Sequence, residues 1–152
     1  MALAFVAAGC GSSDERMSRD EYLQRLRAIE AGPRAREAGA LFFKLVVEPG
    51  LPRSRCQAQA HRFHDDLDAI VDEVASLRPP ADVQRLQNRF VAAARESVAA
   101  VQRAAADAEA GRLRCGTAMN KRIYGLPSTH RAEEVLRELA RLGYVLGLNA
   151  PD

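Results

Sequence analysis

The chain has few aromatic residues: five Phe, three Tyr and no Trp among 152 residues. An excess of one charge is also missing, because 22 basic and 20 acidic residues are interspersed and leave a net charge of only +2. This balance argues against a nucleic-acid-binding protein, which would gather basic residues on one face. Lysine occurs only at Lys44 and Lys121. We attribute the preference for arginine to a GC-rich genome rather than to an arginine-based site.

Motifs typical of catalysis are missing as well. The sequence has no glycine-rich phosphate loop, and none of its serines lies in the glycine-flanked turn of a nucleophile elbow. Carboxylates such as Glu134 and Glu138 lie at helical spacing from arginines, which gives no reason for a perturbed general acid. We therefore expect no enzymatic activity, no catalytic residue and no cofactor.

Abundant alanine and few β-branched residues favour helix throughout, and no segment has a convincing strand pattern. The strongest pattern is a long helical hairpin over residues 54–110, bent at Pro79-Pro80. Apolar residues recur at spacings of three and four on both sides of the bend. They are Phe63, Leu67, Ile70, Val71, Val74 and Leu77 before it, and Val83, Leu86, Phe90, Ala94, Val98, Val101, Ala105 and Ala108 after it. Pro80 lacks an N–H group, so the first helix should end near Arg78 and a second, with Asp82 in its first turn, should begin.

The remaining segments predict further helices around this hairpin. Ser18 and Glu21 have the spacing of a capping box, and Gly32-Pro33 then leaves either two short helices or one kinked helix. A short helix is expected within residues 112–124. The last helix should be capped by Ser128 or Thr129 and bury four residues, Val135, Leu136, Leu139 and Leu142. The fold class predicted is all-α, an up-down bundle of four main helices plus a short fifth helix.

The first nine residues, Met1 to Gly9, are uncharged and precede Cys10. The small residues at positions 7–9 resemble the lipobox of bacterial lipoproteins, in which the signal peptide is cleaved before a cysteine that carries a diacylglyceryl group. Leucine is commoner than Ala7 at its position, and the basic residues that usually open such a signal are missing. The alternative is an ordinary buried segment with an incidental cysteine. The resemblance implies a signal-peptide remnant over residues 1–9, a lipidated Cys10 with a flexible tether over residues 10–17, and one helical domain over residues 18–152.

Further motifs extend this resemblance over most of the chain. They are Cys10-Gly11-Ser12-Ser13 after the small residues, Leu77-Arg78-Pro79-Pro80, Cys115 with Met119-Asn120, and Leu126-Pro127. Together they resemble small exported helical lipoproteins of actinobacteria. The resemblance implies a lipid anchor at Cys10, a bundle on the extracytoplasmic face of the cell membrane and no assigned activity.

The three cysteines are an odd number, and lipidation of Cys10 would leave Cys56 and Cys115 as a pair. Cys56 lies at the start of the first hairpin helix and Cys115 just beyond the end of the second, so antiparallel packing puts both at the same end. We expect a disulfide between them, as an oxidising compartment would allow. Two unrelated buried thiols, as in a cytoplasmic protein, are the alternative.

The segment from His61 to Asp68 is the most suggestive polar cluster. His64 and Asp68 lie four residues apart and share a helix face, and His61 shares one with Asp65, so imidazole and carboxylate groups could bind a transition metal. One helix offers too few ligands, and a solvated face with His64 hydrogen-bonded to Asp68 explains the same pattern. We therefore assign no metal site and keep His61, His64 and Asp68 as candidates.

The sequence thus favours a lipid-anchored, non-enzymatic bundle that binds a protein or envelope partner at the membrane surface. The alternative is a metal- or small-ligand-binding lipoprotein that uses the His61/His64/Asp68 face or a pocket in the bundle core. The apolar segment Tyr144 to Leu148 could contact a partner or membrane, or pack on the bundle. Lys121 and Arg122, beside Arg112 and Arg114, could touch anionic headgroups or form an ordinary solvated face. The sequence does not indicate an oligomeric state.

Overall fold

The computed structural model describes residues 16–47 and 51–144. Within them the chain is all-helical, with six helices and no strand. In chain order they are α1 (Arg19–Glu30), α2 (Pro33–Val47), α3 (Arg53–Ser76), α4 (Gln84–Glu109), α5 (Thr117–Tyr124) and α6 (Pro127–Arg141). Of these described helices, none is both long and apolar enough to cross a membrane.

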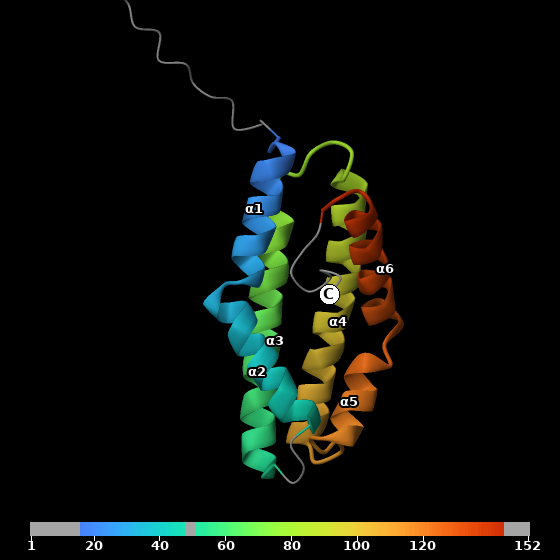
Figure 1. The fold of residues 1–152 in the computed structure, drawn as a ribbon. Coiled ribbons are helices and arrows are strands. Elements are labelled where there is room, and N and C mark those ends of the chain that lie inside the picture. Colours follow the sequence, from blue (N-terminus) through green and yellow to red (C-terminus); the bar gives the residue numbers. More distant parts are fainter. Residues whose placement is uncertain (1–15, 48–50, 145–152) are drawn as a thin grey trace, which may run out of the picture.

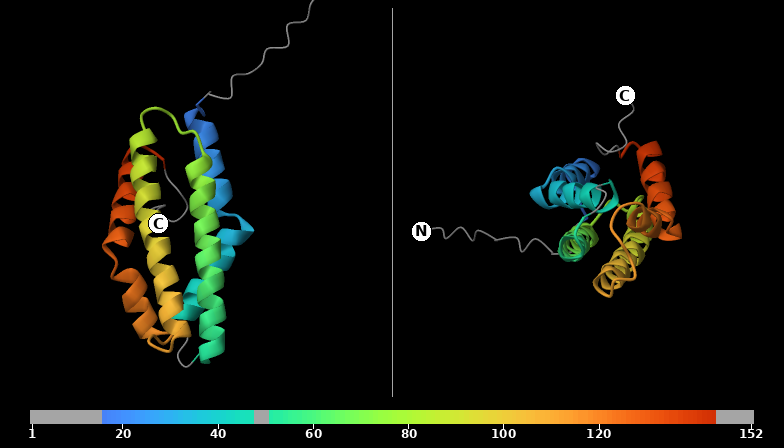
Figure 2. Two further views of the ribbon diagram at one scale, coloured as in Figure 1. Left: turned by 180° about the vertical axis from the view of Figure 1, so that it is seen from behind. Right: turned by 90° about the horizontal axis from the view of Figure 1, so that it is seen from below.

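The antiparallel pair α3 and α4 forms the centre of the molecule (Figure 1). The short helices α1 and α2 pack along α3, whereas α5 and α6 pack along α4 (Figures 1 and 2). The predicted hairpin is therefore confirmed. α3 ends at Ser76, two residues before the predicted position, and Pro79 is buried in the bend. The second helix begins at Gln84, so Asp82 precedes it instead of lying in its first turn.

The outer segments are each broken once, at positions where the sequence has Gly and Pro. α1 ends at Glu30 and α2 begins at Pro33, so the Gly32-Pro33 ambiguity resolves into two helices. α5 ends before Gly125 and α6 begins at Pro127, which suits a first helical position because its missing N–H would have no helical partner there. The break between α5 and α6 was part of the predicted five helices, so the break at Gly32-Pro33 is the one that raises the number of described helices to six.

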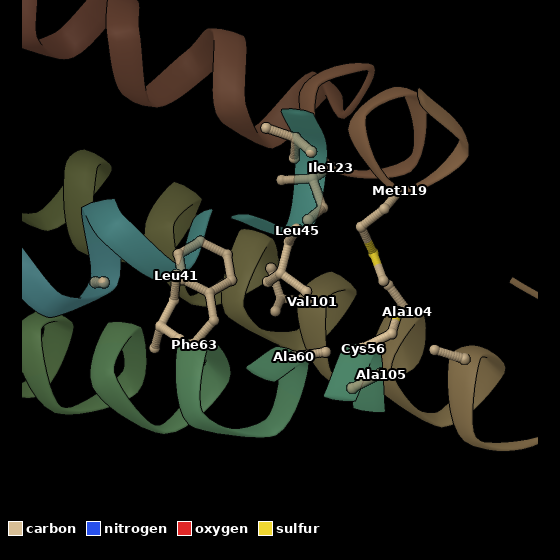
Figure 3. Close-up of a cluster of buried hydrophobic side chains, with 13 residues drawn as sticks. Leu41, Leu45, Cys56, Ala60, Phe63, Val101, Ala104, Ala105, Met119 and Ile123 are labelled. Carbon is tan, nitrogen blue, oxygen red and sulfur yellow. The ribbon is translucent and has the colours of Figure 1, made fainter. Parts of the chain in front are cut away.

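Two stacked clusters of buried side chains hold the helices together. The lower core joins α2, α5, the first half of α3 and the second half of α4, and it includes Leu45, Phe63 and Met119 (Figure 3). The upper core joins α1, α6, the second half of α3 and the first half of α4, and it includes Tyr22, Leu139 and Tyr144. Each break in the outer segments therefore separates a helix of the upper core from a helix of the lower core.

The helix ends confirm one predicted cap and correct another. Ser18 and Glu21 form the predicted capping box, and the hydrogen bonds from Ser18 lower the pKa of the Glu21 carboxyl. At α6, neither Ser128 nor Thr129 is the N-cap residue, which is Leu126. Ser128 is instead buried, and the Ser97 hydroxyl donates to its Oγ at 2.9 Å.

Of the four residues that α6 was expected to bury, Leu142 is not in the core. It forms the C-cap of α6, where the helix ends, and it is 47% exposed. Val135 and Leu139 are buried as predicted, and Leu136 packs at the edge of the upper core.

Candidate functional site

Cys56 and Cys115 lie together at the end of the molecule opposite the proline bend. Cys56 is in the first turn of α3, Cys115 lies between α4 and α5, and their Sγ atoms are 2.07 Å apart, at disulfide distance. The predicted pairing is thus present in the structure. The Gly116 N–H donates to the carbonyl of Leu45 at 2.6 Å, which fixes the start of α5 against the end of α2. We call this end, around Cys56 and Cys115, the disulfide end.

Cys10 and most of the predicted tether lie outside the described residues. The last two tether residues are described and contact the bend between α3 and α4. The backbone N–H of Met17 donates to the carbonyl of Arg78 at 2.9 Å, and the Arg16 guanidinium donates to Gln84 at 2.9 Å. The chain from Cys10 therefore meets the bundle at the bend end, around residues 77–83 (Figure 1).

The candidate metal ligands on α3 do not form a metal site. The His61 side chain is 48% exposed, and its Nε2 lies 3.9 Å from a carboxylate oxygen of Glu109. His64 is more shielded, and its Nδ1 lies 3.0 Å from the carboxylate of Asp65, the next residue, rather than against the expected Asp68. Among residues 16–47 and 51–144, no three His, Cys, Asp or Glu side chains are grouped as metal ligands would be. The arrangement is that of a charged helix surface.

An apolar groove of about 240 Å³ crosses the upper core. α1 and α6 form its sides, and α3 and α4 form its floor. Most of its lining is apolar: Tyr22, Leu26, Ile29, Ala35, Ile70, Val74, Phe90, Leu136 and Leu139. Glu30 and Gln87 are the polar residues of the lining. We call this feature the upper groove.

Gln87 is a buried polar side chain in the floor of the upper groove. Its Nε2 donates to the carbonyl of Leu77 at 3.0 Å, which ties α4 to the end of α3, and its Oε1 accepts no hydrogen bond. Gln87 was not among the residues predicted to matter, although its spacing from Val83 and Phe90 puts it within the apolar stripe. The sequence signal that could have identified it is a glutamine at a position where the helical spacing predicts an apolar residue.

Two tyrosine rings make an edge-to-face contact at the rim of the upper groove. The ring centroids of Tyr22 and Tyr144 are 5.9 Å apart in an edge-on arrangement, and the Arg19 guanidinium lies 4.8 Å from the centroid of Tyr144. Burial raises the pKa of Tyr22 to about 12, and the neighbouring Tyr144 adds to the increase. Burial also raises the pKa of Tyr144, and the nearby Asp82 carboxylate acts in the same direction.

The lower half of the molecule exposes several large apolar side chains. Phe43 and Val47 lie four residues apart on α2 and are 62% and 51% exposed, and Tyr124 on α5 is 48% exposed. The ring of Tyr124 also contacts Phe42, with centroids 5.1 Å apart. In the predicted basic patch, Arg112 and Arg122 both pair with Asp107, so part of its charge is neutralised. We refer to the exposed apolar residues Phe43, Val47 and Tyr124 together as the lower apolar patch.

Comparison with known proteins gives no match to a family model, a curated protein or a solved structure.

Proposed function

We propose that this protein is a lipid-anchored helical bundle on the extracytoplasmic face of the cell membrane, and that it binds a protein partner without catalysis. The observation that carries the proposal is the pairing of Cys56 with Cys115. With these two thiols paired, Cys10 is the odd cysteine of the chain, and it follows the small residues that resemble a lipobox. A structural disulfide also belongs to an oxidising compartment.

In this proposal the bundle has four antiparallel arms. The first arm is α1 and α2 together, α3 and α4 are the second and third, and α5 and α6 together are the fourth. Counted this way, the six described helices make an up-down bundle, with the two Gly-Pro breaks inside its outer arms.

The lower apolar patch is where we place the partner. Arg16 follows Cys10 by six positions, so an extended tether between them reaches about 20 Å. α3 has 24 residues and is therefore about 36 Å long. If the bend end faces the membrane, the disulfide end lies beyond the reach of the tether and stands away from the bilayer. Exposed apolar side chains there suit a protein contact.

The metal-binding alternative has weaker support. His61 points to solvent beside Glu109, and His64 pairs with Asp65 on the same helix. A site that used this face would need ligands from another molecule.

The anchor is tested by the intact mass of the protein extracted from membranes, with and without reduction. We expect the mass of a chain that begins at a diacylated Cys10, and an increase of ~2 Da on reduction as one disulfide takes up two hydrogens. A Cys10→Ser variant should lose membrane retention. An unmodified full-length chain with free thiols would contradict the proposal.

The partner is tested by photo-crosslinking on cells. A photoreactive amino acid replaces Phe43 in the lower apolar patch, and the matched control carries it in place of Arg137, which is exposed on α6. We expect one reproducible protein adduct from position 43 and none from position 137. Equal labelling from both positions, or no reproducible adduct, would count against a partner at this patch.

A further inference from the structure

Positive charge is concentrated at the disulfide end. Residues 40–47, 51–60 and 101–124 form this end (Figure 1), and they contain eight basic and two acidic residues, a formal excess of +6. All other described residues contain 14 basic and 14 acidic residues, so the rest of the described molecule has no net charge. The excess is still +5 when Glu48, next to Val47 in the sequence, is counted. Charges that alternate along the sequence are therefore segregated in space.

Most of these basic side chains are not neutralised by a neighbour. Arg112 and Arg122 share Asp107, and Arg53 donates to a backbone carbonyl, that of Glu109. Five others are exposed and form no ion pair within the part of the chain that the structure describes: Lys44, Arg55, Arg103, Arg114 and Lys121. Neighbouring helices pack about 8–10 Å apart, close to the Debye length of about 8 Å at physiological salt, so the fields of these charges add.

A cleft of about 520 Å³ lies at the disulfide end, beside the start of α3 and the loop between α4 and α5. Two arginines and two leucines line it together with the disulfide: Arg53, Arg114, Leu51 and Leu113. The guanidinium of Arg53 is held by the Glu109 carbonyl, and a methyl group added at Gly111 would lie only 3.0 Å from it. A guanidinium that is already positioned loses little freedom when it binds a carboxylate.

Apolar side chains accompany the basic ones at this end. A second cleft, of about 380 Å³, shares Leu113 with the first and is lined by Lys121 as well as by the ion-paired arginines. In the lower apolar patch, Phe43 directly precedes Lys44, and Tyr124 lies two positions after Arg122. The end of the molecule therefore offers apolar contacts within a ring of positive charge.

We propose that the disulfide end binds an acidic segment of the protein partner, and that carboxylate side chains of this segment enter the cleft lined by Arg53 and Arg114. The inference rests on the proposed function, because it names the chemistry of a partner that we place at the adjoining lower apolar patch. Arginine forks match carboxylates in geometry, and Leu51 and Leu113 suit the methylene groups of glutamate side chains. Complementary charge also speeds the encounter of the two proteins.

Other anionic partners suit this end less well. Binding to a nucleic-acid backbone uses a stripe of basic residues along one face, whereas here the basic residues surround one end of a bundle and have apolar side chains among them. In the proposed orientation the bilayer lies at the bend end, where the chain from Cys10 meets the bundle. An acidic protein surface satisfies both the charge and the apolar contacts.

The first test measures binding of a short fluorescent glutamate-rich peptide to the full-length chain in a Cys10→Ser background, by fluorescence anisotropy. Arg55→Gln/Arg114→Gln is compared with Arg85→Gln/Arg141→Gln, which removes two exposed arginines from the bend end. None of the four forms an ion pair among the described residues, so the Tm of both variants should stay within ~2 °C of the wild type. We expect binding to weaken about tenfold in the first variant and less than about twofold in the control.

Three results of this test would overturn the proposal. One is an equal effect of the two double variants. Another is equal binding of a matched peptide with glutamine in place of glutamate, since charge would then not be recognised. The third is sedimentation with phosphatidylglycerol vesicles that Arg55→Gln/Arg114→Gln abolishes, without binding of the peptide, which would assign this end to lipid headgroups.

The second test is made on cells, with a photoreactive amino acid in place of Lys44 and identification of the crosslinked partner peptide by mass spectrometry. We expect a peptide rich in Asp and Glu, and loss of the adduct in Arg55→Gln/Arg114→Gln. A protein adduct to a peptide without excess acid would overturn this inference and leave the proposed partner contact standing. No protein adduct from position 43 or 44, with tenfold weaker peptide binding in the first test, would refute the proposed partner and support the carboxylate-binding surface.

Discussion

Removal of the Cys56–Cys115 bond should destabilise the folded chain by about 4 kcal/mol. The two cysteines are 59 residues apart in the sequence, and the loop-closure relation gives an entropy of roughly 14 cal/mol/K for that length. For a chain of this size, about 4 kcal/mol corresponds to a Tm that is lower by about 8–16 °C. The size of the effect follows from the unfolded chain, which the bond restricts, more than from contacts made by the sulfur atoms.

The variant to compare is Cys56→Ala/Cys115→Ala in a Cys10→Ser background. Cys56 is buried in the lower core, which also contains small apolar residues of α4 such as Ala104 and Ala108, so alanine keeps the site apolar. The assay is guanidinium unfolding followed by circular dichroism, with the Cys10→Ser protein in its oxidised and reduced forms as references. The reduced reference and the double variant should agree to within ~1 kcal/mol, since both lack the same loop constraint.

The loss should also be uneven along the chain. α5 has eight residues and depends on the Cys115 region and on the bond from Gly116 to Leu45 for its position. Amide hydrogen exchange should therefore accelerate in α5 before it does in α6, because short elements with few partners open first. Equal denaturation midpoints for the oxidised and reduced proteins would refute this reasoning, and so would loss of protection that begins in α6.

Three further outcomes are expected. Gly143→Ala should destabilise the chain by ~1–2 kcal/mol because the residue has positive φ. Gly39→Ala, at an open position inside α2, should stabilise the chain by ~0.5–1 kcal/mol because alanine favours helix over glycine. Urea unfolding measures both changes. Burial of Tyr22 favours its neutral phenol and raises its pKa to about 12, so the contribution of this group to folding stability is complete below pH 10 and is lost as pH rises towards 12. Absorbance at 295 nm should show this late titration disappear in Tyr22→Phe. Equimolar Zn²⁺ should leave the Tm unchanged, and a rise that His64→Ala abolishes would instead establish a metal site.

Helical periodicity was enough to predict the elements and most of the buried stripe of the central hairpin. Val74, Leu86 and Val101 are buried as their spacing predicts, and the capping box at Ser18 is present. The geometry of the hairpin also predicted the cysteine pair, because two antiparallel helices bring the first and last residues of the hairpin to one end. These features depend on residues close together in the sequence, or on the antiparallel packing of two consecutive helices.

The features that were missed depend on how helices rotate and separate in three dimensions. The spacing of α1 and of α6 shows which face of each is apolar, but not that the two faces leave the upper groove between them. The same limit applies to His64, which was expected to pair with Asp68 one turn away and instead pairs with Asp65. Leu142 has the right spacing for burial, but it lies where α6 ends, and the turn at Gly143 leaves it at the surface.

The two breaks in the outer segments explain why the two ends of the molecule differ. An unbroken helix would carry one apolar stripe along the whole hairpin, whereas Gly32-Pro33 and Gly125-Leu126-Pro127 let α1 and α2, and likewise α5 and α6, pack separately on α3 and α4. The lower core is closed by the pair Cys56–Cys115 and has Met119 fully buried at its centre. Among the described residues the upper core has no such covalent link, and it keeps an apolar groove between its helices.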